Sequence, residues 1–277
     1  MRSLPEWMNA RARRENLDEH VDRKHTAHFG LDQMPTGEKE EWVERHFNRV
    51  AAKYDFMNTL LSFGIHYLWK RVAVRAMGLC PGDRVLDLCG GTGDLSILAS
   101  RKVGPQGQVV LCDINRAMIQ AGREKKRLSE IRSRLGYVQG NAEALSFPDG
   151  SFDAAMVGFG IRNLTHLKQG FREMHRVLRP GGQLMCLEFS KPTWPAFRWL
   201  YDIYSFVVMP FLGQLLAGSS QAYACLPETI RMFPLPDELS AILQGIGFTG
   251  VSYRRLTNGI AVIHTGKKTV CNTRGKG

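Results

Sequence analysis

The stretch Arg84-Val85-Leu86-Asp87-Leu88-Cys89-Gly90-Gly91-Thr92-Gly93-Asp94 decides the fold of this chain. Its first half is a brief apolar run that stops at glycines, which predicts a short buried strand. The glycines let the backbone turn tightly and approach a ligand, because no Cβ stands in the way. Apolar residues at helical spacing follow Asp94. A strand, a glycine turn and a helix start predict a nucleotide-type pocket at the carboxyl edge of a sheet.

The glycine spacing indicates which ligand the pocket takes. A dinucleotide fingerprint has the form G-x-G-x-x-G and opens a helix that receives a pyrophosphate. Here Gly91-Thr92-Gly93 is followed by Asp94-Leu95-Ser96, so the third glycine is missing and a carboxylate stands where a diphosphate would lie. A cationic ligand without phosphate fits better, and S-adenosylmethionine is such a ligand. The same departure disfavours a dehydrogenase.

Two later strands end in polar residues that suit the rest of such a ligand. Val109 to Asp113 predicts a strand ending in a carboxylate about twenty residues after the glycine turn, the spacing at which ribose hydroxyls are held. Gly136 to Gly140 predicts a third strand, and Asn141-Ala142-Glu143 follows it, where an adenine edge can be read. The glycine turn alone is weak evidence, but these residues in register with it make the prediction strong.

Composition and charge narrow the class of protein. The chain has 277 residues, an ordinary globular composition and a formal net charge of +11, which permits attraction to nucleic acid or to an anionic membrane. Acidic residues interleave with the arginines near the N-terminus, so we favour a solvated surface there over a nucleic-acid partner. No apolar leader is present and the six cysteines form no C-x-x-C pair, which predicts a cytoplasmic protein without a metal site.

Three regions are expected along the chain. Residues 1–35 carry few periodic apolar positions and predict a flexible extension, while 266–277 predicts a basic tail. Between them, 36–265 alternates strands with helices and finishes in a hairpin at Thr257-Asn258-Gly259. This is the layout of the α/β class I S-adenosylmethionine-dependent methyltransferase fold, a Rossmann-like sheet of seven strands whose last strand is antiparallel. Helices over 38–54 and 66–77 would cover the mouth of the pocket.

Residues 194–217 are strongly apolar and nearly long enough to span a bilayer, which takes about 20 apolar residues. Asp202 and Pro210 interrupt this segment, and it lies between two predicted strands of a sheet, so we do not expect it to span. Two interpretations stay open. The segment is either a buried insertion helix or part of an apolar lid, 194–232, that admits an isoprenoid-tailed substrate at the membrane surface.

With these residues placed, the sequence resembles the ubiquinone/menaquinone biosynthesis C-methyltransferases, the UbiE/MenG family. The resemblance extends from about His28 to His264. Many methyltransferases share the glycine turn, whereas three other runs are far more specific. These runs are Lys53-Tyr54-Asp55, Gly160-Ile161-Arg162-Asn163 and Glu188-Phe189-Ser190-Lys191-Pro192.

The resemblance implies which residues hold S-adenosylmethionine. Family contacts match Thr92, Asp113, Asn141 and Ala142, and Gly158 stands where the family usually has a serine. A contact at Gly158 would therefore come only from backbone or water. The full expected set of cofactor residues is Asp87, Gly91, Thr92, Gly93, Asp113, Ile114, Asn141, Ala142 and Gly158.

The resemblance also implies C-methylation of a polyprenylated quinol, either demethylmenaquinol, 2-methoxy-6-polyprenyl-1,4-benzoquinol or both. The acceptor must be the reduced quinol, since an oxidised quinone ring is electron-poor and does not attack an electrophilic methyl group. Loss of the hydroxyl proton, with a phenol-type pKa of about 10, loads charge onto the ortho carbon. The site therefore has to stabilise a phenolate.

Candidate catalytic residues follow from that need. Arg162 stays protonated, so we assign it stabilisation of the oxyanion, with Asn163 orienting the substrate. His66 is the candidate general base because its ordinary pKa lies near neutrality, and a structural histidine is the alternative. Tyr54 and Asp55 are expected over the methionine portion of the donor, or else they cap the first helix.

Five residues are candidate substrate contacts, namely Asp55 and four others. Glu188 ends the fifth predicted strand of the sheet beside the site, and a simple pair with Lys191 is its alternative role. Tyr223, Glu228 and Arg231 follow the apolar segment and are expected near the quinol headgroup, with ordinary helix packing as the alternative.

Two rival functions share some of these features. An S-adenosylmethionine-dependent O- or N-methyltransferase acting on another small or lipid substrate would have the same cofactor site, but the family-specific runs and the apolar segment argue against it. A non-catalytic scaffold of a quinone-synthesis complex would not need an intact glycine turn with ribose and adenine readers. We therefore expect a cytoplasmic, peripherally membrane-associated enzyme that acts on a polyprenyl quinol, as a homodimer or within a quinone-synthesis complex. Both headgroups stay open.

Overall fold

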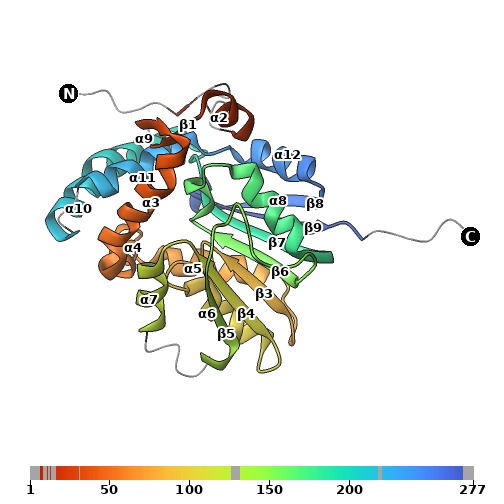
Figure 1. The fold of residues 1–277 in the computed structure, drawn as a ribbon. Coiled ribbons are helices and arrows are strands. Elements are labelled where there is room, and N and C mark those ends of the chain that lie inside the picture. The colour runs from red at the N-terminus through yellow and green to blue at the C-terminus, as the bar shows by residue number, and fades with distance from the viewer. Residues whose placement is uncertain are drawn as a thin grey trace, which may run out of the picture.

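A computed structural model describes residues 7, 8, 11, 13, 17–30, 32–125, 132–217 and 220–270. At its centre lies a seven-stranded sheet with the order β5-β4-β3-β6-β7-β9-β8 (Figure 1). The pairs from β5 to β7 are parallel, and β9 runs antiparallel to both of its neighbours, as predicted. The strands are β3 (Arg84–Leu88), β4 (Gln108–Asp113), β5 (Leu135–Gln139), β6 (Phe152–Gly158), β7 (Leu178–Phe189), β8 (Phe248–Leu256) and β9 (Ala261–Lys268).

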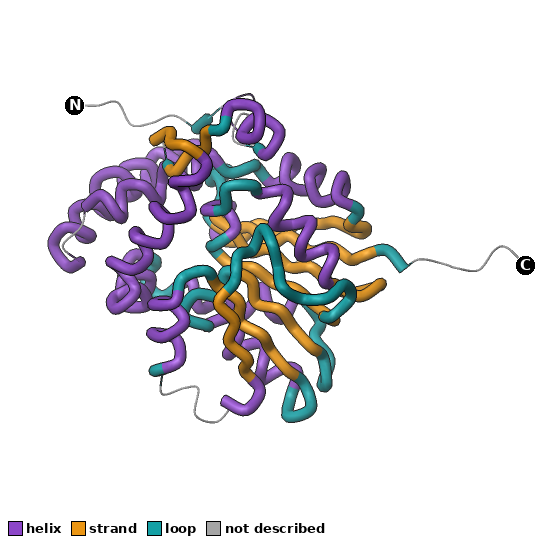
Figure 2. Tube along the Cα trace, viewed as in Figure 1, coloured by secondary structure: helices purple, strands orange, loops and turns teal. Residues whose placement is uncertain are grey.

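Helices cover both faces of the sheet because its central strands are apolar on both sides (Figure 2). Leu86 and Leu88 of β3 belong to the core shared with α8 (Leu167–Val177) and α12 (Pro236–Ile246). Val85 of β3 belongs to the opposite core, shared with α5 (Ile65–Ala76) and α6 (Asp94–Val103). Successive residues of β3 point to opposite faces of the sheet, so each face packs against its own layer of helices.

A group of helices stands at one end of the sheet, on the left of Figure 1. The first part is α3 (Thr36–Val50), η1 (Ala51–Lys53) and α4 (Tyr54–Leu61), so the prediction of one helix through Tyr54 is wrong. The second part, here called the lid, is α9 (Pro195–Ile203), the π-helical η5 (Tyr204–Val208), α10 (Met209–Ala217) and α11 (Ser220–Met232). No residue of α9 is buried, so the interpretation as a buried insertion helix is wrong for α9.

The N-terminal region has more structure than the sequence predicts. Helix α2 (Asp18–Lys24) is followed by the antiparallel strands β1 (Thr26–Phe29) and β2 (Asp32–Pro35). Phe29 is buried, with its ring centroid 4.3 Å from that of Trp42. At the other end, β9 runs to Lys268, so the predicted basic tail begins inside a strand. Residues 271–277 of the tail lie outside the described part of the chain.

Candidate active site

The glycine turn connects β3 to α6 at the carboxyl edge of the sheet. Gly91 and Gly93 have φ of +54° and +81°, a region that favours glycine. Gly90 is needed for a different reason, since a Cβ there would lie 2.6 Å from Cγ of Leu111. The turn is therefore pressed against β4, and its backbone forms one wall of a cavity.

Asp113, at the end of β4, is bound to this turn. Its carboxylate accepts hydrogen bonds from the backbone N–H of Gly91 and of Asn115, both at 2.8 Å. Asp113 lines a small cavity of about 90 Å³ together with Ile114, Asn141 and Ala142. Burial raises the pKa of Asp113. The structure thus brings together the predicted ribose and adenine residues from the ends of β4 and β5.

Asp87 gives the clearest test of whether a cation fits the site. It is fully buried at the end of β3, and Ser96 donates a 2.6 Å hydrogen bond to Oδ2. Its other oxygen, Oδ1, has no hydrogen-bond partner among the described residues. Burial raises the pKa of Asp87 to about 7. A carboxylate with an unsatisfied oxygen beside the glycine turn suits a positively charged ligand, and S-adenosylmethionine fits that requirement.

A larger cavity of about 760 Å³ adjoins the small one. The two share Gly91, Gly158 and Asn163 in their walls. The large cavity runs from the glycine turn past α4 and α5 to the lid. Its end at the glycine turn is lined by polar side chains, and its end at the lid is lined by apolar ones. Its apolar lining from the lid consists of Phe197, Leu200, Tyr201, Tyr204, Met209, Leu226 and Ile230.

Arg162 lines the large cavity and forms a buried ion pair with Glu188, which was predicted to contact the substrate but lines neither cavity. Arg162 lies in η4 (Ile161–Asn163), directly after β6, and its Nη1 is 2.9 Å and 3.1 Å from the two oxygens of Glu188. The side chains are 8% and 2% exposed. The alternative pairing of Glu188 with Lys191 is therefore wrong. Nε of Arg162 is buried and has no hydrogen-bond partner within the described ranges.

His66 and Tyr54 also line the large cavity. His66 is buried, and its Nε2 is 3.3 Å from Oγ1 of Thr59. Burial and the nearby charge of Lys70 lower the pKa of His66 to about 4, so the ring is neutral near pH 7. Burial raises the pKa of Tyr54, so its hydroxyl keeps its proton.

Asp55 and Thr92 belong to a polar network centred on a lysine that the sequence analysis missed. Thr92 donates a 2.6 Å hydrogen bond to Oδ1 of Asp55. Nζ of Lys125, two residues beyond α7 (Arg116–Arg123), is 2.6 Å from Asp55, 2.7 Å from Asp94 and 2.9 Å from Thr92. Lys70 reaches the other oxygen of Asp94 at 2.8 Å. The network ties α4 to the glycine turn.

The substrate contacts predicted after the apolar segment, which fall in α11 of the lid, differ from what the structure shows. Arg231 is buried, pairs with Asp202 and donates to the carbonyl of Pro227, and it is not among the residues lining either cavity. Glu228 lies against Gly30 of the N-terminal hairpin instead. Tyr223 belongs to α11, but its side chain is outside the described part. The residues of α11 that line the large cavity are Cys225, Leu226, Thr229 and Ile230.

The sequence signature of the ubiE/COQ5 methyltransferase family matches residues 35–268. The chain belongs to this family. Two members named ubiquinone/menaquinone biosynthesis C-methyltransferase UbiE are 49% identical to it. The one from Hahella chejuensis aligns over 248 residues, 90% of this chain and 100% of its own. The one from Yersinia enterocolitica aligns over 245 residues, 88% of this chain and 98% of its own.

Solved structures confirm the fold of this ubiE/COQ5 family member. A methyltransferase from Thermotoga maritima matches with a TM-score of 0.57 at 18% identity, covering 82% of this chain and 99% of its own. Haemonchus contortus phosphoethanolamine N-methyltransferase 2, solved with S-adenosylmethionine, matches with a TM-score of 0.59 at 15% identity, covering 86% and 62%. The solved structures confirm the class I fold, and the family signature with the two relatives confirms the predicted family, whose methyltransferase fold is the one that uses S-adenosylmethionine.

In the part of the chain that the structure describes, no helix combines the length and the apolar character needed to cross a bilayer. Within the same residues, no three His, Cys, Asp or Glu side chains are grouped so as to hold a metal ion.

Proposed function

We propose that this protein transfers the methyl group of S-adenosylmethionine to a ring carbon of a reduced polyprenyl quinol. The observation that carries the proposal is the shape and lining of the large cavity. It is polar at the glycine turn and apolar along the lid, as an acceptor with a polar headgroup and an isoprenoid tail requires. The names of the relatives from Hahella chejuensis and Yersinia enterocolitica support the same chemistry.

The residues that would hold the donor lie around the small cavity and the glycine turn. Asp113 would accept from the ribose hydroxyls, while Asn141 and Ala142 would contact the adenine. Asp87 would face the positively charged methionine end with its unpartnered oxygen. When bound there, S-adenosylmethionine supplies an electrophilic methyl group. The lysine network around Asp55 and Thr92 holds α4 closed against this end of the site.

Arg162 is proposed to stabilise the quinolate oxygen. Its guanidinium is already oriented by Glu188 and by the carbonyl of Phe159, and its Nε–H has no partner among the described residues. A donor held in place before the reaction stabilises developing charge without reorganising, and removal of one such donor costs about 10²–10³ in rate in other enzymes. Asn163, beside it, would orient the headgroup.

His66 is not suited to store the quinol proton. Its pKa is lowered to about 4 by burial and Lys70, whereas a phenol-type hydroxyl has a pKa of about 10. Transfer between such groups is uphill by about 8 kcal/mol, since each pKa unit corresponds to about 1.4 kcal/mol. We therefore assign His66 the role of a neutral hydrogen-bond acceptor that orients the hydroxyl. Arg162 lowers the cost of forming the anion, and the hydroxyl proton leaves to solvent. After methyl transfer, the ring carbon loses its proton and the oxygen is reprotonated, so that one proton is released per turnover.

The lid is proposed to rest on the membrane that holds the acceptor. Large apolar side chains of the lid are exposed, including Trp199 and Phe211, and Phe63 beside it is 85% exposed. Phe63 lies next to the lid, with its ring centroid 6.1 Å from that of Tyr204. The net charge of +11 favours an anionic bilayer surface. The protein would thus act from the cytoplasm as a peripheral membrane enzyme and take a quinol that is still embedded by its tail.

The decisive experiment supplies purified protein with S-adenosylmethionine and either reduced demethylmenaquinol or the reduced polyprenyl benzoquinol, without oxygen. We expect a methylated product from at least one headgroup and none from the corresponding oxidised quinones. Comparison of the two quinols identifies the preferred headgroup. No product from either reduced quinol would overturn the substrate assignment.

A further inference from the structure

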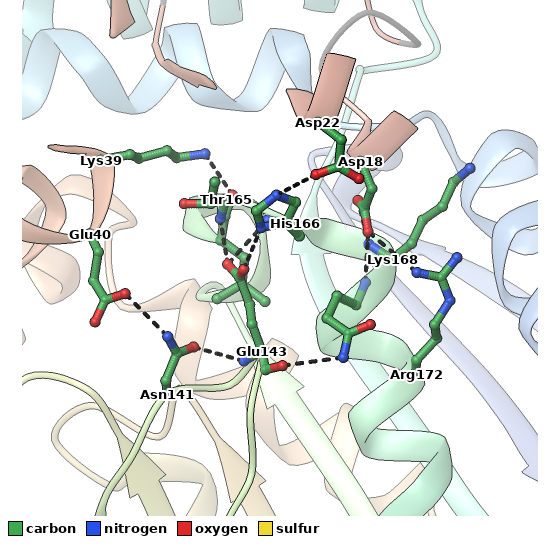
Figure 3. Close-up of polar contacts among 12 residues, drawn as sticks. Asp18, Asp22, Lys39, Glu40, Asn141, Glu143, Thr165, His166, Lys168 and Arg172 are labelled. Carbon is green, nitrogen blue, oxygen red and sulfur yellow. Dashed lines mark hydrogen bonds and ion pairs between the residues drawn. The ribbon is translucent and has the colours of Figure 1, made fainter. Parts of the chain in front are cut away.

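The N-terminal helix α2 lies against the outer side of the cofactor site, in a region outside the family match. Asp18 accepts 2.9 Å hydrogen bonds from the backbone N–H of Lys168 and of Gln169, at the start of α8. One turn further along α2, Oδ1 of Asp22 is 3.0 Å from Nε2 of His166 (Figure 3). The helix is therefore docked by carboxylates of Asp18, Asp22 and Glu19, which pairs with Lys168, and of these three only Asp22 contacts His166.

His166 contacts a second carboxylate through its other ring nitrogen. Its Nδ1 is 2.7 Å from Oε2 of Glu143, and Oε1 of Glu143 accepts from the backbone N–H of Thr165 and His166. Glu143 directly follows Asn141 and Ala142, and its own N–H donates to Oδ1 of Asn141 at 2.8 Å. One imidazole thus joins α2 to the loop after β5 that lines the small cavity (Figure 3).

Helix α3 holds the same loops from the other side. Lys39 donates to the carbonyl of Leu164 at 2.6 Å, and Glu40 accepts from Nδ2 of Asn141 at 3.1 Å. Leu164 and Asn141 both line the small cavity. The loops at the adenine end of the site are therefore held from two sides, by α2 and by α3.

We propose that His166 is a positioning residue of the cofactor site, and that Asp22 acts through it to set the affinity for S-adenosylmethionine. The inference rests on the proposed role of Asn141 and Ala142 in holding adenosine. Only an imidazolium donates from both ring nitrogens, so the two carboxylates are bridged only when His166 is charged. The neutral ring has one donor. Glu143, 17% exposed, retains it, and Asp22, 67% exposed, is released to water.

The surrounding charges favour the charged form of His166, which closes the bridge. Burial lowers the pKa of His166, but Glu143, followed by Asp22 and Asp18, outweighs burial and raises that pKa above its ordinary value. The bridge is therefore intact at low pH and lost as pH rises through the raised pKa. The other charged groups of the cluster are Glu19, Lys39, Glu40, Lys168 and Arg172, and burial lowers the pKa of Lys39 to about 8.

The test is calorimetric titration of the full-length protein with S-adenosylhomocysteine. We expect D22N to raise the Kd for S-adenosylhomocysteine about threefold to tenfold at about pH 6. A change of this size is typical of a residue that acts on a binding site through another residue. The matched control is E19Q, on the same helix, whose carboxylate pairs with Lys168 instead. Its Kd should stay within about twofold of wild type. The ratio of the D22N and wild-type Kd values should fall towards unity as pH rises through the pKa of His166.

Two more variants separate positioning from general destabilisation. H166Q should raise Kd at least as much as D22N, because it also removes the contact with Glu143. The D22N/H166Q double variant should bind no more weakly than H166Q alone, because the bridge is already broken. D113N reports on the cofactor site by itself. Equal binding by D22N and E19Q, a pH-independent ratio, or additive effects of D22N and H166Q would overturn the inference while leaving the proposed function intact. Failure of the wild type to bind would overturn the proposed function.

Discussion

The exposed face of the lid offers the sharpest test of the proposed contact with a membrane. Trp199 in α9 and Phe211 in α10 are 62% and 66% exposed, and neither lines the cavity. The double variant W199S/F211S removes both rings from the surface without opening the core. Val270, 64% exposed and just beyond β9, provides a matched control, V270S, on a different part of the molecule.

The expected loss follows from the area of these rings. Their exposed parts amount to about 150 Å² for Trp199 and about 130 Å² for Phe211, given aromatic side chains of about 200–250 Å². At about 25 cal/mol per Å², complete transfer into hydrocarbon would contribute about 7 kcal/mol. Rings that enter only halfway, as interfacial side chains do, contribute about 3 kcal/mol. That corresponds to a loss of about a hundredfold in partitioning.

The assay is cosedimentation with vesicles of phosphatidylethanolamine and phosphatidylglycerol. W199S/F211S should partition about a hundredfold more weakly than wild type, V270S should partition like wild type, and both should melt within a few degrees of it. Turnover of a short-tailed, water-dispersed quinol should stay unchanged in V270S. Equal partitioning of W199S/F211S and V270S would refute the reasoning, because the lid would then not be the contacting surface.

Three further predictions concern the site. D113N should weaken S-adenosylmethionine binding at least about tenfold, since Asp113 also holds the N–H groups of Gly91 and Asn115; unchanged affinity by calorimetry would contradict this. Burial raises the pKa of Asp87 to about 7, and a bound cation favours its ionised form. The affinity for S-adenosylmethionine should therefore rise with pH through 7, and binding should release a proton. D87N should abolish both the pH dependence and the proton release. R162K should lower kcat about a hundredfold with the KM for S-adenosylmethionine unchanged; a preserved kcat would remove the proposed oxyanion role.

The parts of the fold that sequence predicts well are those set by local patterns. The apolar run before the glycine turn and the strand ending at Asp113 are short, bounded by turns and parallel, so their polar ends meet at one edge. The break after Val50 was not predicted, because the apolar spacing continues through Tyr54 while the backbone tightens to a 3-10 turn. Helix α12 was missed although Pro236 and Glu238 mark its first turn.

The parts of the site that sequence did not predict depend on contacts between distant elements. Arg162 and Glu188 meet because Gly158 of β6 pairs with Leu187 of β7, which brings the ends of the two strands together. This strand register cannot be read from a local sequence pattern. Lys125 lies just beyond a helix, in an ordinary polar stretch, and only the folded chain brings it to Asp55. The lid segment is readily recognised as apolar. Such a segment stays exposed when the rest of the chain already fills the core, and the spacing of apolar residues in the sequence does not show whether it does.

The central claim is that the methyl group goes to carbon, and the product itself tests this most directly. S-adenosylmethionine carrying a carbon-13 methyl group is turned over with the reduced quinol, and the product is examined by NMR. The proposed function predicts a labelled methyl group bonded to a ring carbon next to a hydroxyl-bearing carbon. A label found on oxygen, as a methoxy signal, would contradict it and would make the protein an O-methyltransferase with the same cofactor site.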